Sequence, residues 1–365
     1  MILKRFCAEN FRNIEKCDIK FEGGVNLLYG DNAQGKTNAV EGIYFFARGK
    51  SFRGADDREL SGFSKEGYGI SLEYEDKNGK GKLDYTYFNG ERKRRKNGYK
   101  VSKIKEFIGN FRAVLFCPDD LSLVKGSPEL RREFINVAIG QIYPEYISFY
   151  ANYKKALENR NCLLKNIQKG MFTLPGELES WSDYMAEYAA VINIYRQEYI
   201  KKLEVYTKRF MNEISDGKED IELIYKSDIS EPSNNKGDLA EGYKRILREQ
   251  TEREIAAGVT LFGVHRDDIL ININKNPAKI FSSQGQIRST VLSLKLGEGE
   301  VNREISGEYP VFLFDDVLSE LDEKRREYIL SGVGERQIII TSCMGEDKIF
   351  NCNNKIEVIK GKYCN

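Results

Sequence analysis

Alternation of polar and apolar residues predicts short strands near the start of the chain. The alternation begins at Ile2 and returns at Cys17–Phe21, and an apolar run follows at Val25–Tyr29. A period of two puts neighbouring side chains on opposite faces, so each run fits one strand. Asn38–Arg48 follow a helical period instead, because their apolar side chains share one face: Val40, Ile43, Tyr44 and Ala47.

Residues 68–105 predict antiparallel strands. Charged and apolar residues alternate in this stretch, and it contains the pairs Asn78-Gly79 and Asn89-Gly90. Such pairs favour the tight turns that join neighbouring antiparallel strands. A β subdomain is therefore expected after the first helix.

Between residues 129 and 215 the pattern becomes helical. A long amphipathic helix is expected in the second half of this stretch, and it could pair with residues 146–168 to form an antiparallel arm. Residues 216–238 are polar and contain a loop-like stretch at 231–235, and another helix is expected at Leu239–Ala257. The long helix is predicted by large residues that recur every three or four positions: Trp181, Tyr184, Tyr188, Ile192, Tyr195, Tyr199, Leu203, Tyr206 and Phe210.

Composition limits the classes of protein to consider. The net charge is only +1, so any nucleic-acid binding must come from local basic patches. No apolar run approaches the roughly 20 residues that span a bilayer, and the N-terminal stretch has no apolar signal core. The 7 cysteines are scattered and there is 1 histidine. These features predict a cytoplasmic protein with reduced thiols and no zinc site.

A phosphate-binding loop follows the third predicted strand. It matches the pattern G-x-x-x-x-G-K-[ST] at every fixed position and leads directly into the predicted helix, the context such a loop requires. Its backbone N–H groups and the helix N-terminus would hold the phosphates of ATP, with Lys36 on the β/γ-phosphates and Thr37 on Mg²⁺. The predicted ATP-binding residues are Gly30, Asp31, Asn32, Ala33, Gln34, Gly35, Lys36, Thr37 and Asn38.

An acid pair at the end of an apolar run, Val311–Phe314, supplies the second half of this site. Asp315 is the expected Mg²⁺ carboxylate, and Asp316 is placed to polarise the attacking water as a general base. Lys36 and Asp316 are therefore the predicted catalytic residues. Most of the chain separates them, which indicates a large insertion within the ATPase domain.

Two further motifs flank the acid pair. Ser283, Gln284, Gly285 and Gln286 resemble the L-S-G-G-Q signature of ABC proteins, which holds ATP bound to the other protomer; a plain helix N-cap is the alternative. Leu318–Asp322 resembles the D-loop that lines the dimer interface, with Ser319 and Asp322 as its key polar residues. The motifs predict an α/β fold: an ABC-type P-loop ATPase head with an inserted helical arm lobe.

These residues together resemble the RecF family of bacterial DNA repair ATPases. The resemblance runs over most of the chain and rests most specifically on Gly263–Asp268 and Asp315–Asp322. Val264 departs from the family, which usually has proline there, and Ala33 departs from the related SMC heads, which usually have glycine. Neither change removes a chemical group.

The resemblance implies an ATP-dependent homodimer that hydrolyses ATP slowly, with stimulation by DNA. It implies binding to gapped, single- and double-stranded DNA, action with RecR and RecO, RecA loading and SOS induction. It also implies that Arg12 approaches the nucleotide. The expected organisation is an ATPase lobe over 1–125, a helical arm lobe over 126–258, and completion of the ATPase lobe over 259–365.

Basic residues offer candidate DNA contacts. The run Arg92, Lys93, Arg94, Arg95 and Lys96 could contact phosphates, although a solvated hairpin tip would look the same. Arg131 and Arg132 could face DNA or pair with nearby carboxylates. His265 could be a functional trigger, but a structural histidine is the simpler interpretation.

Other functions are less consistent with the sequence. A transporter ATPase usually has a histidine where Thr341-Ser342 follows the apolar run Ile338–Ile340. An SMC subunit needs far longer helical arms. A small-molecule P-loop phosphotransferase lacks the signature and D-loop. That enzyme and an ATPase subunit of another chromosome-maintenance complex are the remaining alternatives.

Overall fold

The structure is a computed structural model of the 365-residue chain. It describes residues 1–229, 235–318, 321–331, 334–343 and 352–364. None of the helices in these ranges combines the length and apolar character that crossing a bilayer requires.

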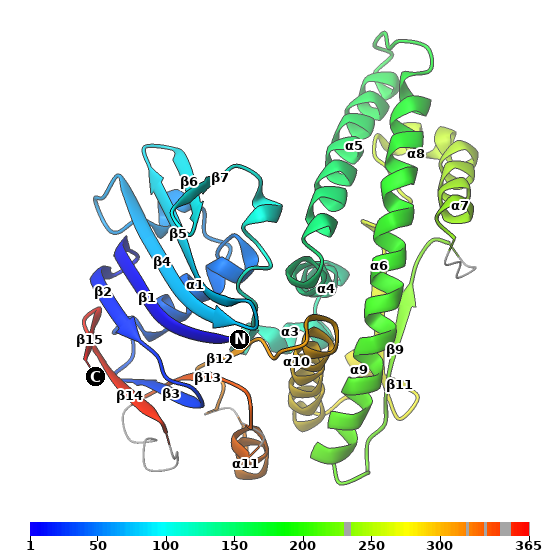
Figure 1. The fold of residues 1–365 in the computed structure, drawn as a ribbon. Coiled ribbons are helices and arrows are strands. Elements are labelled where there is room, and N and C mark those ends of the chain that lie inside the picture. Colours follow the sequence, from blue (N-terminus) through cyan, green and yellow to red (C-terminus); the bar gives the residue numbers. More distant parts are fainter. Residues whose placement is uncertain (230–234, 319–320, 332–333, 344–351, 365) are drawn as a thin grey trace.

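A six-stranded antiparallel sheet forms one layer of the molecule (Figure 1). Two of its hairpins turn at the pairs Asn89-Gly90 and Asn97-Gly98, whose residues all have positive φ, as tight hairpin turns require. The predicted antiparallel structure of residues 68–105 is thus confirmed. In spatial order the strands are β2 (Ile14–Lys20), β1 (Ile2–Phe11), β4 (Gly67–Asp76), β5 (Gly79–Phe88), β6 (Glu91–Lys96) and β7 (Tyr99–Val101).

A mostly parallel sheet forms the second layer, and only the pairing of its last two strands is antiparallel. It brings the strand before the phosphate-binding loop beside β13, which lies next to the strand that ends in the acid pair. Its order is β15 (Lys362–Cys364), β14 (Asn354–Ile359), β3 (Val25–Tyr29), β13 (Ile338–Ser342), β12 (Val311–Asp315) and β8 (Ala113–Phe116).

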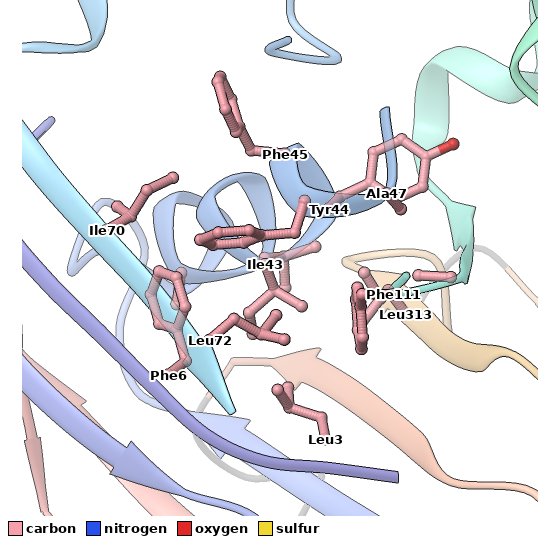
Figure 2. Close-up of a cluster of buried hydrophobic side chains, with 14 of the residues drawn as sticks. Leu3, Phe6, Ile43, Tyr44, Phe45, Ala47, Ile70, Leu72, Phe111 and Leu313 are labelled. Carbon is pink, nitrogen blue, oxygen red and sulfur yellow. The ribbon is translucent and has the colours of Figure 1, made fainter. Parts of the chain in front are cut away.

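Helix α1 (Lys36–Arg48) is buried between these two sheets. Figure 2 shows Ile43 and its neighbours on α1 packed near Phe6 and Leu72 of the antiparallel sheet and Leu313 of the parallel sheet. The predicted apolar face of this helix is therefore confirmed, and the helix begins two residues earlier than expected. We call the two sheets with α1 the ATPase lobe. Its short helices are α2 (Asp57–Leu60), η1 (Ile104–Glu106), η2 (Pro118–Leu121) and α11 (Glu323–Ser331).

A helical part, the arm lobe, stands beside the ATPase lobe (Figure 1). The long antiparallel pair α5 (Pro144–Gln168) and α6 (Glu177–Ile214) forms the arm that the periodicity predicts. Helix α10 (Gln284–Ser306) packs along α6 and joins the arm to the ATPase lobe. The other helices are α3 (Ser122–Lys125), α4 (Pro128–Ile142), α7 (Lys236–Glu249), α8 (Thr251–Ala257) and α9 (Ala278–Phe281).

A small three-stranded sheet completes the arm lobe and departs from the sequence expectation. It contains β9 (Ile221–Lys226), β10 (Asp268–Ile273) and β11 (Asn276–Pro277). β9 lies inside the stretch that looked polar, since only its inward residues Ile221 and Leu223 are buried and the residues between them are charged or exposed.

The buried core also bears on the domain boundaries. Side chains from Val264 to Val301 belong to the same apolar cluster as α5 and α6. This favours a second boundary after α10, at about residue 306, in place of the expected boundary at 258. The division of the chain into domains stays a proposal.

Candidate ATP site

The phosphate-binding loop joins β3 to α1 and has glycine where no other residue fits. Gly30 has φ 150° and a Cβ there would lie 2.3 Å from the carbonyl oxygen of Val358. Gly35 has φ 118°, and a Cβ would lie 2.9 Å from Oδ1 of Asn13. Both values disfavour a side chain. The loop can therefore present backbone N–H groups at the N-terminus of α1, where an anion is stabilised.

Lys36 folds back along this loop. Its Nζ donates to the carbonyl oxygens of Gly30 at 2.5 Å and Asp31 at 2.9 Å. The ammonium group is thus positioned at the mouth of the loop by backbone contacts. A lysine held there can neutralise the β/γ-phosphates of a nucleotide, as the motif predicts.

Thr37 and Asp315 meet at the edge of the parallel sheet. The Thr37 hydroxyl donates to Oδ1 of Asp315 at 3.0 Å, and Thr341 donates to the same oxygen at 2.9 Å. Burial raises the pKa of the Asp315 carboxyl, although these two hydrogen bonds and the positive charge of Arg53 oppose that rise. Hydroxyl and carboxylate oxygens are the ligands that Mg²⁺ prefers, so this pair fits a Mg²⁺ ion.

Asp316 lies at the exposed end of β12. It has φ 55°, and its backbone N–H donates to the Thr341 hydroxyl at 2.9 Å. Thr341 thereby fixes both acids, one through its donated proton and one through its oxygen. The structure brings Asp316 beside Asp315, while its role as a general base stays a prediction.

A C-terminal hairpin supports the loop, and sequence analysis missed it. The backbone N–H groups of Lys360 and Gly361 donate to Gln34, at 2.5 Å to its side chain and 2.8 Å to its carbonyl oxygen. The Tyr363 hydroxyl donates to the carbonyl oxygen of Gly35 at 2.8 Å. No motif marks these residues, because their role depends on β14 pairing with β3.

Arg12 lies in the turn after β1 and binds the first helix. Its guanidinium donates two hydrogen bonds to Glu41, at 2.9 and 2.8 Å, and the Glu41 side chain is fully buried. The next residue, Asn13, contacts both Ala33 in the loop, at 3.4 Å, and Asn38, at 2.7 Å. Arg12 is thus fixed near the loop, and a contact with the nucleotide stays a prediction.

Arg53 is a second basic residue near the loop, and it belongs to none of the sequence motifs. It donates to the side chain of Asn38 at 3.2 Å, and its side chain is 46% exposed. Its only sequence signal is a position soon after the end of α1. An exposed guanidinium at this place can approach a bound anion.

The signature residues begin α10 in the arm lobe. Ser283 accepts a hydrogen bond from the backbone of Gln286 at 3.2 Å, and the Gln286 side chain accepts from the backbone of Ser283 at 2.9 Å. This is a capping box, so the N-cap interpretation holds within the single chain. Ser283 and Gln284 are also exposed, and Gly285 is half-buried, so the helix start is accessible to a second molecule.

Asp322 is connected to the signature through Arg325, which no motif had indicated. The Asp322 carboxylate accepts from the backbone of Arg325 at 2.9 Å and pairs with its guanidinium. The same guanidinium donates to the Ser289 hydroxyl at 2.7 Å and to the carbonyl oxygen of Gly285 at 3.2 Å. Ser319, the other predicted D-loop residue, lies outside the described residues.

The candidate DNA residues fall into two groups. The first is the run on β6, which lies between β5 and the short edge strand β7 of the antiparallel sheet. In this run Arg92 pairs with Asp57 at 2.6 Å and Lys93 with Glu91 at 3.6 Å. Arg94 lies 5.7 Å above the ring of Tyr85. The strand is mostly exposed, including Arg95, so contact with DNA there stays a prediction.

The second group is tied into the arm lobe. Arg131 is 6% exposed and holds Asp268 through two hydrogen bonds, at 2.7 and 3.0 Å. Arg132 donates to the carbonyl oxygen of Asp267 at 2.7 Å. The structure therefore resolves the open alternative for Arg131 in favour of a carboxylate partner. A buried and fully engaged guanidinium is poorly placed to bind DNA.

His265 has the structural role that was the simpler alternative. Its Nδ1 is 2.6 Å from the Tyr153 hydroxyl and its Nε2 is 3.2 Å from the carbonyl oxygen of Thr260. Burial lowers the pKa of His265 to about 4, so the ring is neutral at physiological pH.

Comparison with known proteins gives consistent relatives. The chain is 38% identical over 344 residues to the DNA replication and repair protein RecF of Halalkalibacterium halodurans, covering 94% of this chain and 92% of that protein. It is 38% identical over 371 residues to the RecF protein of Acetivibrio thermocellus, covering 99% of each. No family model matches the chain.

Solved structures agree with these relatives. A structure of the recombination mediator protein RecF with ATPrS in the RecFOR pathway has a TM-score of 0.93, at 35% identity over 99% of this chain and 97% of that one. An SmcHead structure bound to the C-winged helix domain of ScpA has a TM-score of 0.55 at 15% identity over 100% of this chain and 97% of that one, which shows a shared fold alone. The expected ABC-type head is thus confirmed, and the chain belongs to the RecF family of DNA replication and repair proteins.

Proposed function

We propose that this protein is an ATP-dependent DNA-binding switch of recombinational repair and replication. It binds ATP with Mg²⁺, forms a homodimer around the nucleotide, and resets by slow hydrolysis that DNA stimulates. The observation that carries this proposal is the division of the site between two lobes. Lys36 and Asp315 lie in the ATPase lobe, whereas the exposed start of α10 at Ser283 lies in the arm lobe.

Each ATP-site residue of the ATPase lobe has a distinct role in this proposal. The loop N–H groups and Lys36 hold the phosphates, and Thr37 and Asp315 would hold Mg²⁺. Mg²⁺ when bound neutralises charge that develops on the phosphates. Asp316 orients and polarises the attacking water from its exposed position at the end of β12.

The accessible signature supports the proposed dimerisation. Ser283 and the first N–H groups of α10 form an anion-binding helix start that a second protomer's ATP can approach. A symmetric dimer places two such contacts on two ATP molecules, so nucleotide binding and association become coupled. Arg325 joins Asp322 to the same helix and would transmit changes between the D-loop and the signature.

DNA binding is proposed on the basic strand β6, next to the short edge strand of the antiparallel sheet. The β6 residues Arg92, Lys93, Arg94, Arg95 and Lys96 give a local positive strip in a chain whose net charge is only +1. Phosphate contacts of this kind do not depend on base sequence and weaken with salt. We do not include Arg131 in this surface.

The partners and pathway come from the relatives. Their names and the RecFOR pathway named for the solved structure support a role in DNA replication and repair. Within that role we propose action on gapped, single- and double-stranded DNA with RecR and RecO, in support of RecA loading and SOS induction. A small-molecule P-loop phosphotransferase is the alternative function that a direct assay must exclude.

Sedimentation of wild type and three variants, with and without ATP and a short gapped duplex, tests the proposal. Lys36→Ala should lose ATP binding. Asp316→Asn should bind ATP, stop turnover and remain dimeric. Ser283→Arg should bind ATP yet stay monomeric, because the larger side chain blocks the shared phosphate contact.

Salt dependence provides the control for DNA binding. DNA should sediment with the ATP-bound dimer at low salt and dissociate at high salt. A wild-type protein that stays monomeric with ATP and ignores DNA at both salt concentrations would contradict the proposed function.

A further inference from the structure

Three large apolar side chains are strongly exposed beside the two halves of the proposed shared site. Phe63 is 97% exposed, Ile280 is 72% exposed and Phe281 is 67% exposed. A single exposed apolar residue needs no explanation. Their positions do, because one lies by the phosphate-binding loop and the other two lie by the signature.

Phe63 is fixed near the loop by its turn. The N–H of Gly62 donates to the carbonyl oxygen of Asn10 at 2.7 Å, and the N–H of Arg12 donates to that of Leu60 at 2.8 Å. Asn13, which follows Arg12 in the turn between β1 and β2, contacts Ala33 of the loop. Phe63 therefore stands in a turn that is hydrogen-bonded to the β1–β2 turn, which itself contacts the phosphate-binding loop, and its side chain is exposed there.

Ile280 and Phe281 end the short helix α9 just before the signature. Ala278 at its start is buried, and the N–H of Ser282 returns to the carbonyl oxygen of Ala278 at 3.2 Å. Phe281 precedes Ser283 by two residues, so their Cα atoms lie within about 8 Å. The apolar pair is thus held beside the group expected to reach the partner's ATP.

We propose that, in the ATP-bound dimer, Phe63 of one chain packs against Ile280 and Phe281 of a second copy. This rests on the proposed function, since it requires that Ser283 of one chain faces the phosphate-binding loop of the other. That arrangement brings the rims of the two half-sites together. Two-fold symmetry then makes the contact twice in each dimer.

The contact would give the dimer apolar area in addition to the phosphate contacts. Each half-site alone leaves its aromatic side chain in water, whereas the pair buries both. Burial of a phenylalanine side chain favours association by roughly ten- to a hundredfold. The same side chains would then contribute little to ATP binding by the monomer.

The test measures dimerisation and ATP affinity separately. Phe63→Asp and Phe281→Asp are compared with wild type by sedimentation in saturating ATP, and ATP affinity is measured on dilute monomer. We expect dimers at least tenfold weaker with unchanged ATP affinity. Phe172→Asp is the matched control, because Phe172 is 85% exposed at the tip of the arm, and it should dimerise like wild type.

A mixed dimer provides a stronger test. Phe63→Lys in one chain and Phe281→Asp in the other place opposite charges across one contact and leave the second contact native. The mixture should dimerise more strongly than either variant alone. This rescue requires the two positions to meet across the interface.

Each failure has a distinct meaning. If wild type does not dimerise with ATP, the proposed function and this inference both fail. If wild type dimerises and both aspartate variants match the Phe172→Asp control, only the inference fails. If Phe63→Asp weakens ATP binding by the monomer as much as it weakens the dimer, Phe63 stacks on the nucleotide base and the contact is refuted.

Discussion

Glu298 allows a direct test of what a buried carboxyl costs in free energy at the junction of the two lobes. It lies on α10 and is 4% exposed, and its Oε2 has no hydrogen-bond partner among the described residues. It lines a cavity of about 140 Å³ between α1, α4 and α10, together with Lys295 and Tyr44. Lys295 itself pairs with Asp120 at 2.8 Å.

The charged form of Glu298 is therefore costly. Burial raises the pKa of Glu298 from 4.5 to about 7, although the positive charge of Lys295 opposes the rise. Between these values the folded chain holds a proton that the unfolded chain has released. The contribution of Glu298 to the free energy of unfolding is then greatest below pH 4.5 and falls as pH rises towards 7, by about 3 kcal/mol in total.

Glu298→Gln should remove this dependence. The amide keeps the shape of the side chain but cannot ionise, so the variant avoids the cost of a buried charge at high pH. The free energy of unfolding of the variant minus that of wild type should increase by about 2–3 kcal/mol between pH 5 and pH 8. Urea unfolding followed by circular dichroism at several pH values measures that difference.

A surface acid provides the control. Glu158→Gln on α5 removes a carboxylate that is exposed, so its difference from wild type should stay nearly constant over the same pH range. An equally flat difference for Glu298→Gln would refute the argument, because Glu298 would then ionise as easily in the folded chain as in the unfolded one.

Two further predictions concern groups that hold distant segments together. Arg160→Met leaves the fully buried Glu254, bound at 2.6 Å, without its counter-charge. It should lower the free energy of unfolding, measured by urea denaturation, by about 3–5 kcal/mol. The double variant with Glu254→Leu should regain much of that loss. If it does not, the loss does not come from the broken ion pair. Arg325→Ala removes the connection between Asp322 and Gly285. Sedimentation should show about tenfold weaker ATP-dependent dimers with normal ATP binding by the monomer, and an unchanged dimer would show that the connection is dispensable.

The sequence by itself determined the local parts of this protein. The loop Gly30–Thr37 could be predicted from the sequence because its geometry depends on consecutive residues, two of which must be glycine. The apolar strand before Asp315 and the long helix α6 could be predicted for the same reason, because their patterns also lie in consecutive residues. Strand pairing at 68–105 followed from its turn residues.

Tertiary structure alone decided which distant groups meet. Thr341 holds both acids and Tyr363 holds the loop, yet neither belongs to a motif that predicts this. In the sequence Arg131 is a candidate DNA contact, and only the fold brings its partner Asp268 beside it. Periodicity reports which face of an element is buried, whereas a hydrogen-bond partner far along the chain is set by how whole elements pack. That packing fixed the supports of the ATP site and paired Arg131 with Asp268.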